Sequence, residues 1–396
     1  MLYDETMLSR HMQPLTGSAI REIFHLLGKP GMISFAGGNP AVTALEPDVI
    51  SDIAQKVLKT HGWRLLQYGA TEGFGPLLES IAHFIESSGI KAQPSQILPC
   101  QGAGQALDLL VKATCNEGDV VLVESPTFLG ALQTFLTYGV KLVPLPSDGE
   151  GVIVEEAEAL IKAHHPKLMY IIPTFQNPSG KTLGLARRQR LCELAAGYGV
   201  VLAEDDPYRD LRYRGEALPA IKSFDKEGWV VYMGSFSKLI SPGLRMGYAM
   251  SDNPTLFRKL VIGKQSADVH SPLLNQAIVD EYLRAGYMPG HIARICGDYK
   301  KQLTLMLEGL EAIPGIAFTK PEGGLFVWAE LPEGMNATDM LREAVARNVA
   351  YVPGTHFHCE GGHHNTLRLN FSNSAPEQIR QGMEILKDLI LEKSKA

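Results

Sequence analysis

Short apolar runs alternate with longer amphipathic stretches through the middle of the chain. Buried strands are predicted at 120–124, 141–145, 168–173, 199–204 and 229–233, and helices at 128–138 and 185–198. Strands that alternate with helices favour a mostly parallel sheet with helices on both faces. We therefore expect an α/β fold whose ligands bind beyond the carboxyl ends of the strands.

The C-terminal part of the chain has a different pattern. Helices are predicted at about 289–310 and 376–391, with strand-like runs between them at 325–330 and 366–370. This pattern predicts a second, smaller α+β domain, and 396 residues are long for a single core. We expect an N-terminal arm at 1–45 that packs with the small domain and the substrate pocket, a large domain at 46–285, and the small domain at 286–396.

Composition is typical of a soluble globular protein. Hydrophobic residues make up 45% of the chain and charged residues 20%, and a formal net charge of -6 leaves no basic surplus for nucleic acid. The five cysteines lack paired spacing, which is typical of reduced thiols. No apolar run approaches the ~18 residues of a membrane span, and residues 1–10 are too polar for a signal peptide. We expect a cytoplasmic enzyme that binds neither nucleic acid nor membrane.

One lysine stands among hydroxyl groups and glycines directly after a predicted strand. The stretch 234–247 contains Ser235, Ser237 and Lys238, and Arg245 follows. A lysine amine can attack a carbonyl cofactor, while hydroxyls and a guanidinium can bind a phosphate. Taken alone, the stretch is more typical of a polar loop with an exposed lysine.

Polar residues also follow two other predicted strands. Asp205 and Tyr208 come after the strand at 199–204. A buried carboxylate can keep a pyridine nitrogen protonated, and a tyrosine can donate to an oxygen on the same ring. Asn177 follows the strand at 168–173, and its amide could donate to that oxygen. Taken alone, these segments are equally typical of a helix N-cap and of a turn.

Glycines precede a helix that we expect to begin near Ala106. Gly102 and Gly104 would expose backbone N–H groups to a phosphate there, whereas the third glycine of a dinucleotide-binding motif is missing. Phe128, after the next strand, could stack on a flat ring or belong to the core.

In this order, the motifs resemble those of the fold-type I pyridoxal-phosphate (PLP) enzymes, specifically the class I/II aminotransferases. The resemblance extends from about Ser18 to the C-terminus and is greatest to the 2-aminoadipate and kynurenine aminotransferase branch. The segments 18–23 and 33–40 look like the opening of that branch, and 235–238 with 243–247 resembles the family's most specific signature. The resemblance implies an amino-acid aminotransferase that moves an amino group between an L-amino acid and a 2-oxo acid by ping-pong chemistry.

The resemblance implies roles for the residues around the cofactor. Lys238 would be the Schiff-base lysine and proton shuttle, and Asp205 would pair with the pyridinium nitrogen. Asn177 and Tyr208 would flank the ring oxygen, and Phe128 would stack on the ring. The phosphate would be bound by Gly102, Ala103, Gly104, Ser235, Ser237 and Arg245.

The resemblance also implies substrate and subunit contacts. Arg368 would bind the substrate α-carboxylate bidentately, with Asn177 beside it and the backbone of Gly38 close by. Tyr68 would reach the phosphate of a neighbouring subunit, which predicts a homodimer with shared active sites. Arg21, in a predicted helix, could bind the distal carboxylate of glutamate or 2-aminoadipate, or could be a solvated arginine.

Two segments depart from the family pattern. Ala103 and Gly104 stand where relatives usually have Ser and Gln, so the phosphate site has fewer side-chain donors. The segment 41–45 differs from the Pro-rich form that relatives have near the substrate. The amino-acid donor, the 2-oxo-acid acceptor and the pathway therefore stay open.

Other polar clusters predict no further chemistry. Histidines and a cysteine crowd one segment, at His356, His358, Cys359, His363 and His364. Their spacing fits no standard zinc pattern, so we expect a polar loop and no metal. Lys264 and His270 are expected in a mobile surface loop at 263–270 and receive no role.

Three classes of function are compatible with these motifs. The first is transamination. The second is another PLP reaction on the same fold, such as a β-lyase or a decarboxylase, because the orientation of the breaking bond selects the reaction. The third is a PLP-sensing regulator, which needs an N-terminal winged helix that we do not expect ahead of Ser18. We favour transamination.

Overall fold

The predicted apolar runs form one large central sheet. In the computed structural model, which describes residues 7–13, 15 and 31–394, seven strands lie in the order β2-β10-β9-β8-β7-β3-β4. These strands are β2 (Ile97–Cys100), β3 (Val120–Glu124), β4 (Lys141–Leu145), β7 (Leu168–Ile171), β8 (Val201–Asp205), β9 (Val230–Ser235) and β10 (Gly247–Met250). Only β10 runs antiparallel to its neighbours, so the expected mostly parallel sheet is confirmed.

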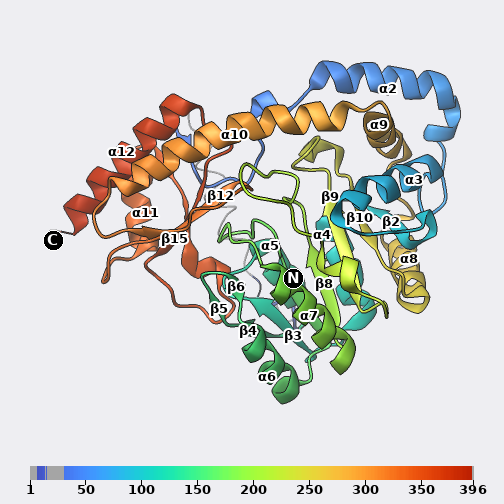
Figure 1. Ribbon diagram of the computed structural model, residues 1–396, viewed down its shortest axis with the longest axis horizontal. Helices are drawn as coiled ribbons and strands as arrows, with labels where there is room; N and C mark the ends of the chain where they lie inside the picture. Colours follow the sequence, from blue (N-terminus) through green and yellow to red (C-terminus); the bar gives the residue numbers. More distant parts are fainter. Residues whose placement is uncertain (1–6, 14, 16–30, 395–396) are drawn as a thin grey trace.

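Helices cover both faces of this sheet (Figure 1). Alternation along β3 shows why, since Val121 and Val123 belong to one apolar core while Leu122 belongs to another. The first core includes side chains of α4 (Ala103–Thr114), α5 (Leu129–Thr137) and α8 (Pro254–Asp268). The second includes side chains of α6 (Val154–His164) and α7 (Leu185–Tyr198).

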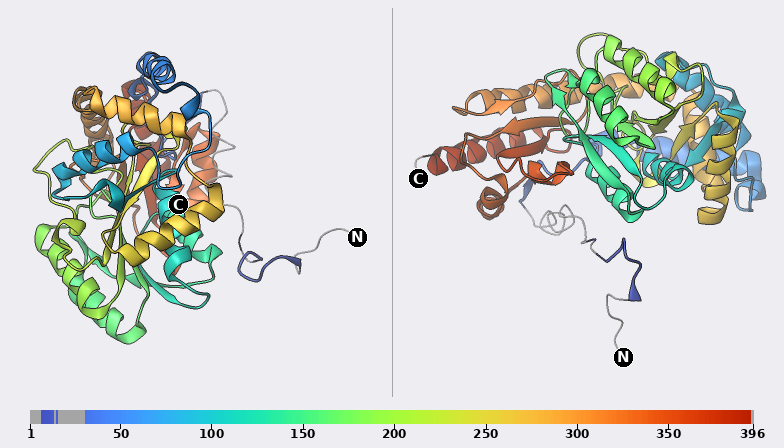
Figure 2. Two further views of the ribbon diagram at one scale, coloured as in Figure 1. Left: turned by 90° about the vertical axis from the view of Figure 1, so that its right-hand side faces the viewer. Right: turned by 90° about the horizontal axis from the view of Figure 1, so that it is seen from below.

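A smaller antiparallel sheet has the order β11-β12-β15-β14. Its strands are β11 (Ala317–Phe318), β12 (Phe326–Glu330), β15 (Thr366–Asn370) and β14 (Val352–Pro353). It is accompanied by α10 (Tyr287–Glu311), α11 (Ala337–Ala346) and α12 (Pro376–Lys393), and Figure 2 shows this unit at one end of the molecule. The large sheet with a smaller α+β unit is the fold class expected from the sequence.

The segment after residue 31 ties the N-terminal part of the chain to the smaller unit. Strand β1 (Ile33–Ser34) pairs in parallel with β13 (Val349–Ala350). Farther along, α2 (Pro47–His61) and α3 (Gly75–Phe84) pack against α9 (Leu273–Arg284) beside the large sheet. The chain between β1 and α2 therefore passes from one unit to the other.

Three local expectations are wrong. Helix α4 begins at Ala103 rather than near Ala106, because Gly102 adopts φ 82° immediately before it. No helix follows Asp205, so the N-cap alternative fails there. The segment expected as a mobile loop at 263–270 is largely the end of α8, where Lys264 is buried and pairs with Asp268 at 2.9 Å.

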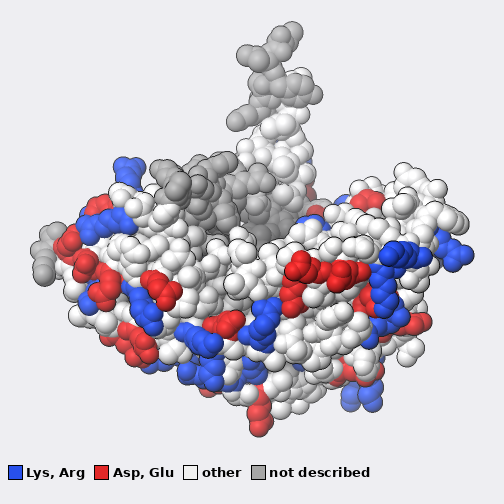
Figure 3. Space-filling model, turned by 90° about the horizontal axis from the view of Figure 1, so that it is seen from above, with Lys and Arg blue, Asp and Glu red and all other residues white. Residues whose placement is uncertain are grey.

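The surface shows no single-sign charge field on the face in Figure 3, where acidic and basic side chains are interspersed. Among the described residues, no helix is both long and apolar enough to cross a membrane.

Candidate active site

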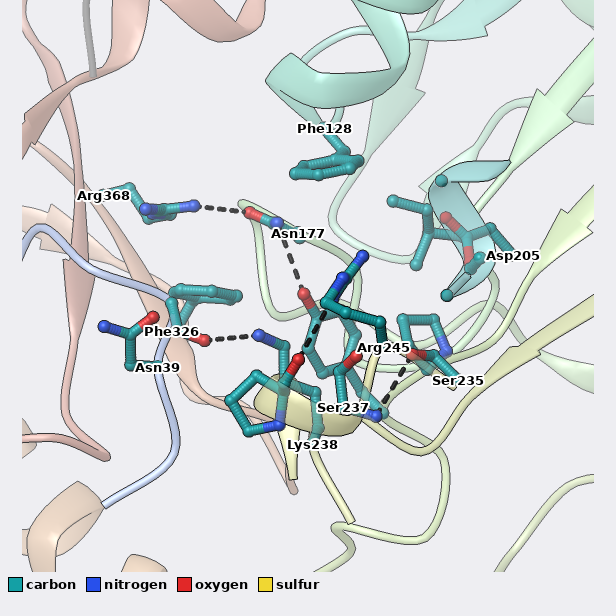
Figure 4. Close-up of a pocket in the computed structure, with 18 residues that line it drawn as sticks. Asn39, Phe128, Asn177, Asp205, Ser235, Ser237, Lys238, Arg245, Phe326 and Arg368 are labelled. Atoms are coloured by element: carbon teal, nitrogen blue, oxygen red, sulfur yellow. Dashed lines mark hydrogen bonds between the residues drawn. The ribbon is translucent and has the colours of Figure 1, made fainter. Parts of the chain in front are cut away.

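A pocket of about 350 Å³ lies where strands of the large sheet end and the smaller sheet begins (Figure 4). Asp205 ends β8, Asn177 follows β7, and Lys238 follows β9. Arg368 enters from β15 of the smaller sheet, and Figure 4 shows it on the opposite side of the pocket from Asp205. The parallel strands thus place side chains that are distant in sequence around one cavity.

The pocket contains almost every residue that the sequence nominated. Those that line it are Gly38, Gly102, Ala103, Gly104, Phe128, Asn177, Asp205, Tyr208, Ser235, Ser237, Lys238, Arg245 and Arg368. Tyr68 does not line the pocket and is 80% exposed. Arg21 and the segment 18–23 lie outside the residues that the structure describes.

Sequence reasoning missed other residues of the pocket wall, namely Asn39, Ile172, Pro207, Pro242 and Phe326. The sequence alone does not reveal the role of Phe326. Its place in the site follows from strand pairing, because the strand of Phe326 pairs with the strand of Arg368. The Arg368 guanidinium lies 4.2 Å from the centre of the Phe326 ring. An aromatic ring in that strand therefore forms part of the arginine site.

Lys238 is held at the floor of the pocket by a backbone carbonyl. Its Nζ donates a hydrogen bond to the Gly38 oxygen at 2.6 Å. Burial, together with the positive charges of Arg368 and Arg245, lowers the pKa of Lys238 to about 8. Roughly a tenth of the amine is therefore uncharged at pH 7, far more than for a lysine with its ordinary pKa, and the neutral amine is the nucleophilic form.

Asp205 presents one unsatisfied oxygen to the pocket. Its Oδ2 accepts a hydrogen bond from the Tyr170 hydroxyl at 2.6 Å, whereas its buried Oδ1 has no partner among the described residues. Burial raises the pKa of Asp205 to about 7, opposed by the Tyr170 hydrogen bond and reinforced by Asp206. A cationic ring nitrogen placed beside Oδ1 would satisfy this oxygen and favour the carboxylate.

The phosphate-binding candidates gather at the start of α4. Ala103 and Gly104 are its first residues, so their N–H groups have no partner within the helix. Arg245 adopts φ 51° and donates from Nη2 to the Gln101 oxygen at 2.9 Å. A Cβ on Gly102 would lie 3.0 Å from that same Nη2. Glycine at 102 therefore allows the guanidinium to lie against the backbone.

Arg368 is buried yet keeps free hydrogen-bonding capacity. Nη1 donates to Asn177 Oδ1 at 2.9 Å and Nη2 donates to the Ala36 oxygen at 2.6 Å, while the buried Nε has no partner among the described residues. Burial lowers the pKa of Arg368 to about 10, so the group stays cationic at neutral pH. A buried cation without an acidic partner favours an anionic ligand.

Asn177 also connects the arginine to the tyrosine. Its Nδ2 lies 3.4 Å from the hydroxyl oxygen of Tyr208, and both side chains are buried. Lys238, Arg245 and Arg368 bring three positive charges to the pocket, against the carboxylate of Asp205. The residues therefore fit PLP together with an amino acid, because these carry a phosphate, a ring nitrogen and an α-carboxylate.

The histidine-rich segment gathers in part outside this pocket. Potential ligand atoms of His358, Glu360 and His363 lie within 4.8 Å of one another. However, the two imidazole rings are stacked, with centroids 3.8 Å apart and planes inclined by 14°. Parallel rings do not direct both lone pairs at one ion, and Ser125 Oγ already lies 2.7 Å from His358 Nδ1. The expectation of no metal stays a prediction.

A partly buried lysine after a strand of a large α/β sheet, in one pocket with a buried aspartate, is typical of PLP enzymes of fold type I. The family model of the aminotransferases of class I and II matches residues 30–386. The chain belongs to this family and is a PLP-dependent amino-acid aminotransferase.

Individual relatives agree with this assignment. The chain is 42% identical to aromatic-amino-acid aminotransferase 1 of Thermococcus litoralis, over 96% of this chain and 93% of that protein. It is 39% identical to the 2-aminoadipate transaminase of Thermus thermophilus, over 94% and 93%. Its fold matches the kynurenine aminotransferase of Pyrococcus horikoshii, solved with the cofactor form PMP, with a TM-score of 0.94 at 39% identity, covering 99% of this chain and 98% of that one.

Proposed function

We propose that the residues of this pocket perform transamination in the roles that their positions favour. Bound PLP supplies an aldehyde and an electron-withdrawing ring. Lys238 would hold the cofactor covalently and would move the proton at the substrate α-carbon. The observation that carries this proposal is a partly buried lysine with a pKa of about 8, in the same pocket as a buried aspartate with one oxygen that has no partner among the described residues.

The other side chains orient the cofactor and the substrate. Asp205 keeps the ring nitrogen protonated, while Asn177 and Tyr208 donate to the ring oxygen. Phe128 packs on the ring. Phosphate is bound by the backbone of Gly102, Ala103 and Gly104 and by Ser235, Ser237 and Arg245. Each contact restrains the ring, so the bond to be broken stays aligned with it.

Arg368 binds the α-carboxylate of the amino acid. Its guanidinium is fixed by Asn177, by Ala36 and by the Phe326 ring, which leaves its geometry defined before substrate enters. Gly38 brings backbone next to the same position, and a Cβ there would lie 3.2 Å from the Phe326 ring. A pre-oriented guanidinium selects α-carboxylates and fixes the substrate amine toward Lys238.

The protein is proposed to act as a homodimer with shared active sites in the cytoplasm. Tyr68 is 80% exposed and shares its segment with Trp63 and Leu66, exposed by 71% and 74%. Large apolar side chains exposed together favour a protein interface. In the dimer, Tyr68 would complete the phosphate site of the partner subunit.

The chain is further proposed to divide into the arm at 1–45, the large domain at 46–285 and the small domain at 286–396. Helix α10, which begins at Tyr287, carries the chain from the large unit to the small one. The pocket lies between these units, so their relative position would control access to Arg368.

The substrates are proposed to be L-amino acids with aromatic or long acidic side chains, because the curated relatives are named for such compounds. The test is a panel of amino acids with 2-oxoglutarate or pyruvate as acceptor. A transaminase converts PLP to its amine form with the first substrate and restores it with the second. Release of ammonia or carbon dioxide, without restoration by a 2-oxo acid, would instead identify a lyase or a decarboxylase.

A further inference from the structure

Tyr170 is a buried residue of β7 whose hydroxyl reaches the pocket aspartate. It is fully buried, and its hydroxyl donates to Asp205 Oδ2 at 2.6 Å. The neighbouring strands explain the contact, since Tyr170 pairs with Ala203 in the parallel register of β7 and β8, two residues before Asp205. The side chain therefore reaches the carboxylate from the neighbouring strand of the sheet.

The ring of Tyr170 is fixed by its surroundings. Phe135 of α5 packs edge-on against it, with centroids 5.7 Å apart and planes inclined by 75°. Burial and the neighbouring Asp205 raise the pKa of Tyr170 well above its ordinary value. The hydroxyl thus stays protonated and acts only as a donor to the carboxylate.

Because of this contact, the two oxygens of Asp205 have different surroundings. Oδ2 is occupied by Tyr170, and Oδ1 is left without a partner among the described residues, in a side chain that lines the pocket. A donor on one carboxylate oxygen stabilises the charged form, and it also fixes the rotation of the group. Without that donor, burial would raise the pKa of Asp205 further, and a neutral carboxyl pairs less well with a cation.

We propose that Tyr170 is a positioning residue for the reaction: its hydroxyl favours the ionised form of Asp205 and turns the carboxylate so that Oδ1 meets the protonated ring nitrogen of the cofactor. This inference rests on the proposed role of Asp205 and adds a second residue, behind it, that sets the electron-withdrawing strength of the ring. If Tyr170 had only a structural role, Asp205 would merely accept the hydrogen bond of its buried hydroxyl, and the protonation of the ring nitrogen would not depend on Tyr170.

The chain supplies a matched control in β9, on the other side of β8 from Tyr170. Tyr232 of β9 is 1% exposed, and its hydroxyl lies 3.3 Å from Oδ2 of Asp206, the residue next to Asp205. Asp206 does not line the described pocket. Tyr232→Phe therefore removes a buried tyrosine–aspartate hydrogen bond at similar depth without touching Asp205.

The test is ¹⁵N NMR of the ring nitrogen in holoenzyme reconstituted with ¹⁵N-labelled PLP, for wild type, Tyr170→Phe, Tyr232→Phe and Asp205→Asn. We expect a protonated nitrogen in wild type and Tyr232→Phe, and a shift toward the unprotonated value in Tyr170→Phe. Turnover of Tyr170→Phe should fall about tenfold to a hundredfold in kcat, with little change in KM. A Tyr170→Phe spectrum identical to wild type overturns the proposal.

Two further measurements keep the outcomes separate. If Asp205→Asn also leaves the nitrogen protonated, the proposed role of Asp205 fails, independently of Tyr170. If Tyr170→Phe does not fold, 3-fluorotyrosine incorporated at 170 preserves the packing and makes the hydroxyl a stronger donor. It should change the titration of the ring nitrogen, whereas the same substitution at 232 should not. No change at 170 would overturn the inference.

Discussion

The guanidinium of Arg368, in β15 of the smaller sheet, donates to the side-chain oxygen of Asn177, in the loop after β7 of the large sheet, at 2.9 Å. The same asparagine lies 3.4 Å from the Tyr208 hydroxyl through its amide nitrogen. One amide therefore joins the candidate carboxylate site to the candidate ring-oxygen site. In the proposed roles of these residues, this side chain would couple substrate binding to cofactor orientation.

Arg368→Lys should weaken the binding of amino acids more than the binding of PLP. A lysine cannot form the bidentate contact or the bond to Asn177, so kcat/KM should fall about tenfold to a hundredfold. The measurement is steady-state kinetics beside a PLP titration. Arg347→Lys is a control, because Arg347 pairs with Glu392 on the surface, away from the pocket. Equal losses in PLP affinity and kcat/KM would contradict a carboxylate-binding role.

Incorporation of PLP into apoenzyme should accelerate with pH until about 8. Only the neutral amine attacks the aldehyde, and burial with Arg368 and Arg245 lowers the pKa of Lys238 to about 8. The rate should rise roughly tenfold per pH unit well below that value and level off above it. Stopped-flow absorbance from pH 6 to 10 measures this. A rate that keeps rising past pH 9.5 would indicate a lysine with its ordinary pKa of about 10.4.

Gly102→Ala should reduce the affinity for PLP severalfold, beyond any loss of stability. Gly102 has φ 82°, and a Cβ there would lie 3.0 Å from Arg245 Nη2, so the guanidinium must shift. Gly118→Ala provides the comparison, because Gly118 has φ 85° with nothing within 4 Å of its Cβ. Both variants carry about 1 kcal/mol of backbone strain. Calorimetric titration should show weaker PLP binding in Gly102→Ala only. Equal PLP affinities of the two variants would exclude the proposed phosphate site beside Gly102.

The fold was predictable wherever the chain obeys local rules. The strand expected at 120–124 is β3 to the residue, and the rule that ligands bind beyond parallel strand ends located Asp205 and Asn177. Lys264 was assigned wrongly because its charge suggested exposure, whereas Asp268, Gln105 and Ser271 satisfy it inside the protein. Whether a charged side chain is buried depends on partners that only the tertiary structure provides.

The residues that carry the chemistry of the site were predictable from the sequence, whereas the residues that hold them in position were less so. Resemblance named Arg368, but its contacts with Asn177 and Phe326 join segments far apart in the sequence. Tyr170 was hidden for a different reason: in an apolar strand, a tyrosine looks like an ordinary core residue. Its function follows only from the single atom that its hydroxyl reaches.

Mixing two impaired variants tests the shared active site. Tyr68→Phe should weaken the phosphate contact in the partner subunit, and Lys238→Ala should remove the nucleophile from its own subunit. After subunit exchange, a mixed dimer contains one site that has both Tyr68 and Lys238, so activity should rise above that of either parent. Exchange is verified by native mass spectrometry of tagged chains. Exchanged dimers without regained activity would show that the sites are not shared.

Reduction of the holoenzyme with borohydride, followed by peptide mapping, tests the central claim most directly. We expect a pyridoxyl label on Lys238, because this partly buried lysine lines the pocket and has a lowered pKa. Lys238→Ala should lose both the label and turnover while retaining the fold, as judged by circular dichroism. A label on a different lysine, or full activity in Lys238→Ala, would contradict the account.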